Sequence, residues 1–238
     1  PPISCYIRAK NEERKIADVI RAVKPAVDEV VLVDSGSTDQ TVALAEEAGA
    51  RVVHQEWLGY GAQKRFAEDQ CKHDWLLSID ADEVISSEFA DELRALFARG
   101  EPSQPVFQVT IINAPAVGKP WRGFNQLYRN RLYDRRKIRT PDHAAWDQLD
   151  IPTGMRVGKL RAPILHYSIA DLGHLESKFN TISGVHASEA KLKPFAQVVV
   201  RVLFAEGFYF FKHYVMRGLW RAGLYGFAVA KIAAHGRW

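Results

Sequence analysis

The first 110 residues or so of this chain alternate short apolar runs with longer stretches that carry the spacing of amphipathic helices. Parallel strands need crossover helices between them, so alternation of this kind indicates a parallel sheet covered by helices. The sequence therefore predicts an α/β fold with a mostly parallel sheet flanked by helices. The expected strands are 3–8, 29–33, 51–55, 75–79 and 106–112, and the expected helices are 12–24, 39–48, 62–71 and 88–99.

Helix boundaries carry the residues that usually mark them. Asp39 or Thr38 is the expected N-cap of the second helix, and Gly49 stands just beyond its end. Pro25 is expected to end the first helix.

The pattern changes after residue 112. Residues 113–150 are rich in Gly, Pro, Trp and Arg and show no clear periodicity, which predicts a long loop of the kind that often carries function. A strand over 160–167, a helix near 171–190 and a basic, aromatic tail are expected to follow.

Composition excludes several classes of protein. With 238 residues and 47% hydrophobic residues, the chain can bury a large core and is neither disordered nor a disulfide-stapled mini-protein. It has no uncharged apolar run of about 18 residues, so it is not expected to span a membrane. We also expect no export signal, because the first residues run directly into a strand. Cys5 and Cys71 are far apart and form no CxxC motif, which favours buried, reduced thiols in a cytosolic protein.

Acidic residues follow the fourth expected strand. Asp80 and Asp82 are two positions apart in extended chain, so they point to the same side, with Glu83 next to them. Paired carboxylates favour a hard cation such as Mg²⁺ or Mn²⁺, and ligands of open α/β sheets bind at this end of the strands. The alternative is that these acids only cap the next helix.

Two further turns could bind a nucleotide. Asp34 ends the second strand, where a carboxylate can accept hydrogen bonds from a ribose or a base. Gly59 and Gly61 form half of a dinucleotide fingerprint, but a third glycine is missing, so a classical NAD site is not expected. With Lys64 and Arg65 beyond them, the two glycines could approach a diphosphate, or they could form a surface loop.

Four segments in this order, CYIRAKNEE (5–13), VLVDSGSTD (31–39), GYGAQKRFA (59–67) and DWLLSIDADE (74–83), resemble the family 2 glycosyltransferases with the GT-A fold. Within that family, the branch that adds sugars to the lipopolysaccharide inner core is the most similar. The resemblance covers about the first 100 residues well and the rest loosely.

The resemblance implies a nucleotide-diphosphate-sugar donor, most often a UDP-sugar, and an inverting transfer assisted by Mg²⁺ or Mn²⁺. It implies that Asp82 is the main metal ligand, and it leaves Arg65 in a position where the family usually has Asn. The residues that it places at the nucleotide-sugar are Ala9, Asn11, Glu12, Asp34, Lys64 and Asp80.

An inverting transfer also needs a general base for the acceptor hydroxyl. In the resembling branch this base usually stands in a V-H-E-x-L-like segment, which corresponds here to residues 145–149 and to Asp147. Asp142 and Asp150 are the alternatives.

The resemblance also gives His166 a role, because GT-A enzymes often recruit a late histidine to the metal or the diphosphate. A histidine at a strand end could equally be hydrogen-bonded in the core. Arginines of the 122–139 stretch could bind an anionic acceptor such as a phosphorylated sugar, since guanidinium pairs bidentately with phosphate. The candidates are Arg129, Arg131 and Arg136, together with Arg122, Arg135 and Arg139.

The C-terminal tail carries the excess positive charge. Residues 194–238 contain six Lys and Arg against Glu206, a net charge of +5, which leaves −1 for the rest of a chain whose total is +4. Aromatic residues interspersed with cations favour helices lying on an anionic membrane surface. The core of a helical subdomain and a dimer interface are alternatives, and nucleic acid is not an expected partner because no recognised motif accompanies the charge.

The sequence thus predicts a nucleotide-sugar-binding half over 1–112, an acceptor-binding half over 113–190 and an amphipathic helical tail over 191–238. The expected function is transfer of a hexose, glucose by preference, from a UDP-sugar to a lipid-linked saccharide at the cytoplasmic face of the cell membrane. A nucleotidyltransferase is an alternative, but residues 8–13 (RAKNEE) stand where its GxGTR-like signature belongs. The other alternative is a catalytically silent scaffold protein that binds a nucleotide-sugar.

Overall fold

The computed structural model describes residues 1–117, 126–169, 171–189 and 194–237. The chain forms two compact units, which are described separately. Unit 1 comprises residues 1–111 and 127–166, and unit 2 comprises residues 112–126 and 167–238. The segment 113–190, predicted as one acceptor-binding half, is divided between them.

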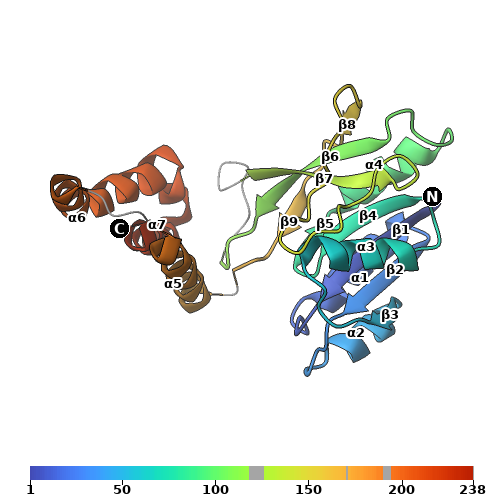
Figure 1. Ribbon diagram of the computed structural model, residues 1–238, viewed down its shortest axis with the longest axis horizontal. Helices are drawn as coiled ribbons and strands as arrows, with labels where there is room; N and C mark the ends of the chain where they lie inside the picture. Colours follow the sequence, from blue (N-terminus) through green and yellow to red (C-terminus); the bar gives the residue numbers. More distant parts are fainter. Residues whose placement is uncertain (118–125, 170, 190–193, 238) are drawn as a thin grey trace. The chain divides into compact units, whose positions relative to one another are not determined.

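Unit 1 begins with the parallel sheet that the sequence predicts (Figure 1). Its strands lie in the order β3-β2-β1-β4, and each neighbouring pair is parallel. The chain therefore adds β2 and β3 on one side of β1 and then crosses to the other side for β4. These strands are β1 (Ile3–Ala9), β2 (Glu29–Asp34), β3 (Arg51–His54) and β4 (Trp75–Asp80).

The rest of the sheet corrects the prediction of an irregular segment over 113–150. β7 (Gln126–Asp134) lies within that range and pairs antiparallel with β4. Its sequence, QLYRNRLYD, is rich in polar residues, and the strand is buried only from Arg131 to Asp134, so it lacks a strand's usual hydrophobic alternation. The expected strand over 160–167 is only three residues long. The other strands are β5 (Glu83–Ile85), β6 (Val106–Asn113), β8 (Val157–Lys159) and β9 (Ile164–His166), with β5 antiparallel to β9 and β8 parallel to β6.

Helices cover both faces of this sheet. One core contains buried residues of α1 (Ile16–Val23), α2 (Thr41–Ala48) and α4 (Ser87–Phe97), packed against alternate residues of β1 such as Ile7. The opposite face of β1 presents Tyr6 to a second core, to which α3 (Tyr60–Gln70) contributes Ala67. Both cysteines are buried and free, as predicted.

Two of the predicted helix ends are confirmed. Gly49 follows α2 with φ of 92°, a conformation that glycine adopts without strain, and α1 ends at Val23 before a short 3-10 turn that contains Pro25. The N-cap of α2 is Gln40 rather than Thr38 or Asp39. The Asp39 carboxylate nevertheless accepts the N–H of Thr41, the first residue of α2. Asp39 therefore caps one free N–H group of the helix although it stands one residue before the N-cap.

Unit 2 is helical. It contains α5 (Leu172–Glu189), α6 (Phe195–Phe211) and α7 (Gly223–Arg237), with short helical turns at Lys212–Met216 and Leu219–Ala222. A small core includes Leu175, Leu219 and Val229. Every residue of α6 is described, and none of them is buried. Within the described ranges, no helix combines the length and the apolar character needed to cross a bilayer.

Candidate active site

The candidate site lies where β1, β2 and β4 end side by side, an edge that we call the carboxyl edge. The register of the sheet pairs Ala9 with Asp34 across β1 and β2, and Arg8 with Asp80 across β1 and β4. The chain reverses its direction of strand addition at β1, and ligands of open α/β sheets bind at such a switch point. Asp34 and Asp80, which the sequence places at strand ends, therefore lie at the same edge of the sheet.

Asp80 is held at this edge by an arginine from β7. The Nη2 atom of Arg131 donates to Asp80 Oδ2 at 2.6 Å and to Glu83 Oε1 at 2.5 Å, and the Asp80 N–H donates to Glu83 Oε2 at 2.9 Å. Burial alone would raise the pKa of Asp80, but the charges of Arg131, Lys64 and Arg8 hold that pKa well below its usual range. Asp80 is thus a carboxylate at any physiological pH.

Arg131 and Glu83 are interior residues. Arg131 is 5% exposed and Glu83 is 1% exposed, and burial raises the pKa of Glu83 to about 7 although Arg131 opposes this. The guanidinium that the sequence assigned to the acceptor therefore binds the Asp80 carboxylate instead. Sequence spacing gave no sign of this pairing, because it joins β4 to a strand that was not expected.

Asp82 and His166 come together as the sequence predicted for a metal pair. The antiparallel pairing of β5 with β9 sets Glu83 opposite His166, and His166 Nε2 lies 3.0 Å from Asp82 Oδ2. Burial lowers the pKa of His166, but its hydrogen bond to Asp82 and the charges of Asp82, Glu83 and Asp80 together raise the pKa above its ordinary value.

This pair fits a divalent cation only in part. A carboxylate oxygen and an imidazole nitrogen suit Mn²⁺, and both side chains are partly accessible. The described residues include no group of three or more His, Cys, Asp or Glu side chains arranged to hold a metal. A cation at Asp82 would therefore need oxygen ligands from a diphosphate or from water.

Asp147, the candidate base, lies beside two cations. Lys64 Nζ is 3.0 Å from Asp147 Oδ2 and also donates to the Asp147 carbonyl oxygen at 3.1 Å. Arg8 Nη2 reaches Asp147 Oδ2 at 3.2 Å and Asp80 Oδ1 at 3.5 Å. Burial would raise the pKa of Asp147, but the charge and hydrogen bond of Lys64 keep it below its ordinary value. The structure thus links Asp147 to the carboxyl edge through Lys64 and through Arg8, a residue that the sequence analysis missed.

The glycines of the 59–61 turn serve another purpose than the sequence suggested. The N–H groups of Tyr60 and Gly61 donate to the carbonyl oxygens of Ala144 and His143, at 2.8 and 2.9 Å. A Cβ atom on Gly61 would lie 2.3 Å from the Pro141 carbonyl oxygen. The helix N-terminus is therefore occupied by the 141–147 segment, so its amides are not free for a diphosphate.

The same helix anchors the start of that segment. Glu68 of α3 is buried and accepts hydrogen bonds from Tyr133 Oη at 2.7 Å, Arg139 Nε at 2.7 Å and the Thr140 N–H at 2.8 Å. Lys64 lies one helical turn earlier on α3 and holds Asp147. One helix thus binds both ends of the segment that carries the candidate base.

The expected nucleotide residues form a pair of facing loops. The Asn11 side chain accepts the Thr38 N–H at 2.8 Å, and the Glu12 N–H donates to Thr41 Oγ1 at 2.7 Å. The Asp34 carboxylate accepts the N–H groups of Gly36 and Ser37, so its own turn already uses both oxygens. Ala9 is buried at the end of β1.

Glu12 lies close to several other carboxylates at this edge. Burial raises its pKa to about 7, and the carboxylates of Asp82, Asp39 and Asp80 add to the shift. A bound cation would relieve this repulsion.

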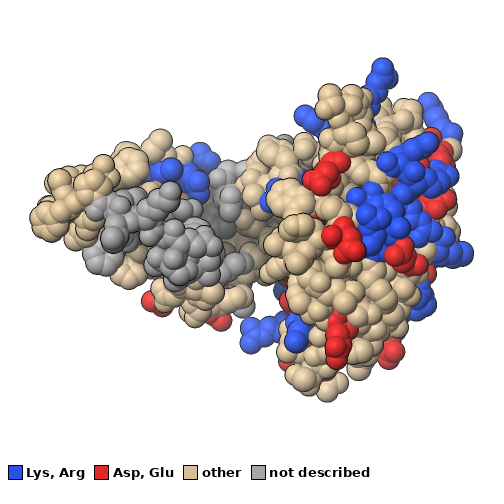
Figure 2. Space-filling model, viewed as in Figure 1, with Lys and Arg blue, Asp and Glu red and all other residues tan. Residues whose placement is uncertain are grey.

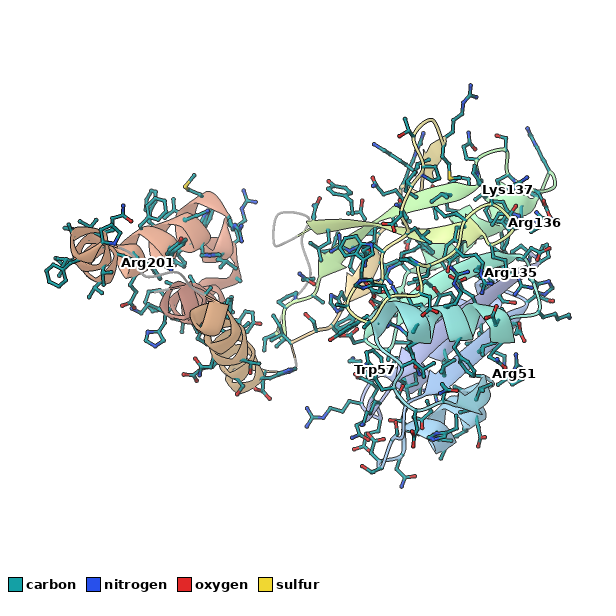
Figure 3. All side chains as sticks on the ribbon, viewed as in Figure 1. Arg51, Trp57, Arg135, Arg136, Lys137 and Arg201 are labelled. Carbon is teal, nitrogen blue, oxygen red and sulfur yellow. The ribbon has the colours of Figure 1, made fainter. Side chains whose placement is uncertain are left out.

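Arg136 lies away from this edge. Arg136 follows β7 at the end where Asp134 pairs with Trp75, the first residue of β4, and it binds Asp134 and Glu101. Figure 3 shows Arg136 far from Trp57 within unit 1. Because Asp80 ends β4 and Trp75 begins it, Arg136 belongs to the opposite edge of the sheet, which argues against the predicted acceptor contact. Arg129 donates to the Tyr128 carbonyl, and Arg122 lies outside the described residues.

Comparison with known proteins identifies the family. The model of the family described as glycosyl transferase family 2 matches residues 4–162. An uncharacterized glycosyltransferase of Rickettsia bellii (strain RML369-C) is 33% identical over 245 residues, covering 99% of this chain and 83% of the relative. This chain belongs to glycosyl transferase family 2, and its sheet and flanking helices are GT-A-like.

Two other matches carry more informative names. The lipopolysaccharide core biosynthesis glycosyltransferase LpsC of Rhizobium meliloti (strain 1021) is 32% identical over 245 residues, covering 98% of this chain and 88% of LpsC. A crystal structure of glucosyl-3-phosphoglycerate synthase from Mycobacterium tuberculosis, in complex with Mn²⁺, UDP and glucosyl-3-phosphoglycerate, matches with a TM-score of 0.38 and 29% identity. That match covers 47% of this chain and 43% of the synthase, so it spans less than half of either.

Proposed function

We propose that this glycosyltransferase moves a hexose, glucose by preference, from a UDP-sugar to a lipid-linked saccharide such as the lipopolysaccharide inner core, with inversion and with a divalent cation. The observation that carries the proposal is the convergence on one sheet edge of the Asp82–His166 pair and of Asp147 beside Lys64. Similarity to LpsC, a lipopolysaccharide core biosynthesis glycosyltransferase, supports the acceptor class.

In this proposal Asp82 and His166 hold Mg²⁺ or Mn²⁺, which offsets the charge of the leaving diphosphate when bound. The loops of Ala9, Asn11, Glu12 and Asp34 hold the nucleotide. Asp80, kept ionised by Arg131, contacts the ribose and cation side of the donor.

Asp147 takes the proton of the acceptor hydroxyl while the oxygen of that hydroxyl attacks C1 of the donor sugar. The bond from C1 to the diphosphate breaks on the opposite side, and UDP leaves. Lys64 and Arg8 hold the Asp147 carboxylate. An anionic diphosphate would compete for these two cations, so we expect donor binding to free Asp147 for its role as base.

Calorimetric binding of UDP, UDP-glucose and GDP-mannose, each with Mn²⁺ and with EDTA, tests the donor and the metal. We expect UDP and UDP-glucose to bind with Mn²⁺ and about tenfold or more weakly with EDTA, because the cation is a major source of positive charge for the diphosphate. Asp82→Asn should remove this metal dependence.

Asp91→Asn is the matched control, since Asp91 is an exposed carboxylate on α4 that pairs with Arg94 of the same helix. It should behave like the wild type. Nucleotide binding that is unchanged both by EDTA and by Asp82→Asn would contradict the metal site. A wild type that binds none of the three nucleotides would contradict the assignment of the donor.

We also propose that unit 2 contacts the membrane surface, on the cytoplasmic side. Figure 2 shows a largely uncharged surface over α6. Its exposed apolar side chains include Phe195, Leu203, Phe204 and Phe208, and the helical turns beyond it expose Met216 and Trp220. Apolar side chains of this size with nearby Lys and Arg suit the interface of an anionic bilayer.

Sedimentation with vesicles tests this contact. We expect the protein to bind vesicles containing phosphatidylglycerol, with weaker binding at higher salt, and to bind phosphatidylcholine vesicles less. The double change Leu203→Glu and Phe204→Glu should reduce binding about tenfold or more, since it removes two apolar anchors and adds two repelled charges. The control Ser103→Glu adds a charge to the exposed surface of unit 1 and should have little effect. Equal binding of the double variant and the wild type would refute the contact.

A further inference from the structure

Three large aromatic side chains stand half exposed on the two segments that meet at the start of α3. Trp57 is 49% exposed, Tyr60 is 54% exposed and Trp146 is 50% exposed. Trp57 precedes α3 and Tyr60 is its first residue, whereas Trp146 belongs to the 141–147 segment. We call these three residues the aromatic platform.

The rings are held in place although they are exposed. Trp57 and Tyr60 pack edge to face, with ring centroids 5.1 Å apart and an interplanar angle of 90°. Trp146 Nε1 donates to Asp150 Oδ1 at 3.0 Å. Both segments are joined through their backbones, because the Tyr60 N–H donates to the Ala144 carbonyl oxygen at 2.8 Å.

The platform adjoins the candidate base. Trp146 directly precedes Asp147 in the chain. Arg8 connects the other segment, since its Nη1 donates to the Tyr60 carbonyl oxygen at 3.0 Å while its Nη2 reaches Asp147 Oδ2 at 3.2 Å. One arginine and one peptide bond thus link the aromatic platform to the candidate base.

A sugar ring is suited to such a surface. One face of a pyranose carries mainly C–H bonds, which pack against an aromatic ring, while the hydroxyl groups at its rim need polar partners. Tyrosine and tryptophan offer a large contact area for little loss of side-chain entropy. Fixing the rings before binding reduces that loss further.

We propose that the aromatic platform is the acceptor subsite, where Trp57, Tyr60 and Trp146 hold the saccharide ring that bears the attacking hydroxyl. This inference rests on the proposed function and extends it, since it assigns the acceptor to side chains other than the arginines considered above. The ligand class is a neutral pyranose ring within an oligosaccharide.

The test uses delipidated, heptose-containing core oligosaccharide of lipopolysaccharide as the probe and the full chain labelled with ¹⁵N at its tryptophans. We expect the oligosaccharide to shift the indole N–H signals of Trp57 and Trp146, which single substitutions assign. Trp57→Ala and Tyr60→Ala should each weaken oligosaccharide binding about tenfold, the effect of losing one aromatic contact. Trp57→Phe should restore most of the affinity, because a flat ring remains.

Several outcomes would overturn the proposal. These are a wild type that does not bind the oligosaccharide, unchanged affinity in both alanine variants, or shifts of the same signals by phosphatidylglycerol vesicles and not by the oligosaccharide. UDP-glucose binding is measured on the same samples. If it stays within about twofold of the wild type, the variants are folded and the donor site is intact. A wild type that binds the oligosaccharide through these rings but binds no nucleotide would reject the proposed function and, with it, the role of the platform as an acceptor subsite.

Discussion

Asp147→Asn is expected to lower kcat for sugar transfer by about 10³-fold. UDP-sugar binding in the presence of Mn²⁺ should be no weaker than in the wild type, because a neutral amide competes less than a carboxylate with the diphosphate for Lys64 and Arg8. The amide keeps the shape of the side chain, and its oxygen can still accept a hydrogen bond from Lys64, which now lies 3.0 Å from Asp147 Oδ2. It cannot take up the proton of the acceptor hydroxyl. The loss should therefore fall on the chemical step, measured as release of UDP in a single turnover with acceptor present.

Asp142→Asn and Asp150→Asn are the matched controls, because both carboxylates belong to the same part of the chain. We expect each to retain kcat within about tenfold, the second with some loss because Asp150 accepts the indole N–H of Trp146. If either control abolishes turnover while Asp147→Asn remains active, the base has been assigned to the wrong residue. A separate assay of UDP-sugar hydrolysis without acceptor shows whether the donor is still activated.

The sequence located the strand ends that form the carboxyl edge, because strand ends can be recognised from hydrophobic pattern alone. Apolar runs ending at Ala9, Asp34 and Asp80 are enough to bring these residues to one edge once the sheet is parallel. The proximity of Asp82 and His166 was also predicted, though only through the family resemblance. Their contact depends on the antiparallel pairing of β5 with β9, and β5 itself was not expected.

The sequence did not reveal the ion pairs that hold the site together. Arg131 looked like one of several surface arginines, because its strand carries charged and polar residues at most positions. The contact of Arg131 with Asp80 joins residues 51 positions apart, and no local pattern encodes a pairing of that range. The role of Arg8 was also missed, because the other residues of its strand are all buried and the strand therefore reads as part of the core.

Gly59 and Gly61 show how one motif can fit two different structures. Two glycines before a helix match the approach of a backbone to a phosphate, and they match equally the approach of one backbone to another. The structure shows the second, because Ala144 and His143 accept the two N–H groups that a phosphate would have used. The glycines thus affect catalysis by letting the 141–147 segment, which carries Asp147, pack against the start of α3.

Gly61→Ala is accordingly expected to lower kcat by about 10²-fold or more, although the substitution adds one methyl group. Gly61 lies within α3, where alanine suits the backbone better than glycine, so the expected defect does not come from the helix. It comes from the new Cβ atom, which would lie 2.3 Å from the Pro141 carbonyl oxygen and 2.4 Å from that of Trp146. The 141–147 segment must move away, and a displacement of about 1 Å in a catalytic group is enough for such a loss.

Gly207→Ala is the matched control, because it makes the same substitution inside α6 at a position where a Cβ atom meets nothing within 4 Å. It should leave kcat unchanged and stabilise its helix by about 1 kcal/mol. Metal-dependent UDP binding by Gly61→Ala separates displacement of the segment from global unfolding, since Asp82 directly precedes β5 and His166 ends β9, whereas Gly61 belongs to α3. If Gly61→Ala binds UDP and retains full kcat, the segment accommodates the methyl group without moving Asp147, and the role of α3 in positioning the base is refuted.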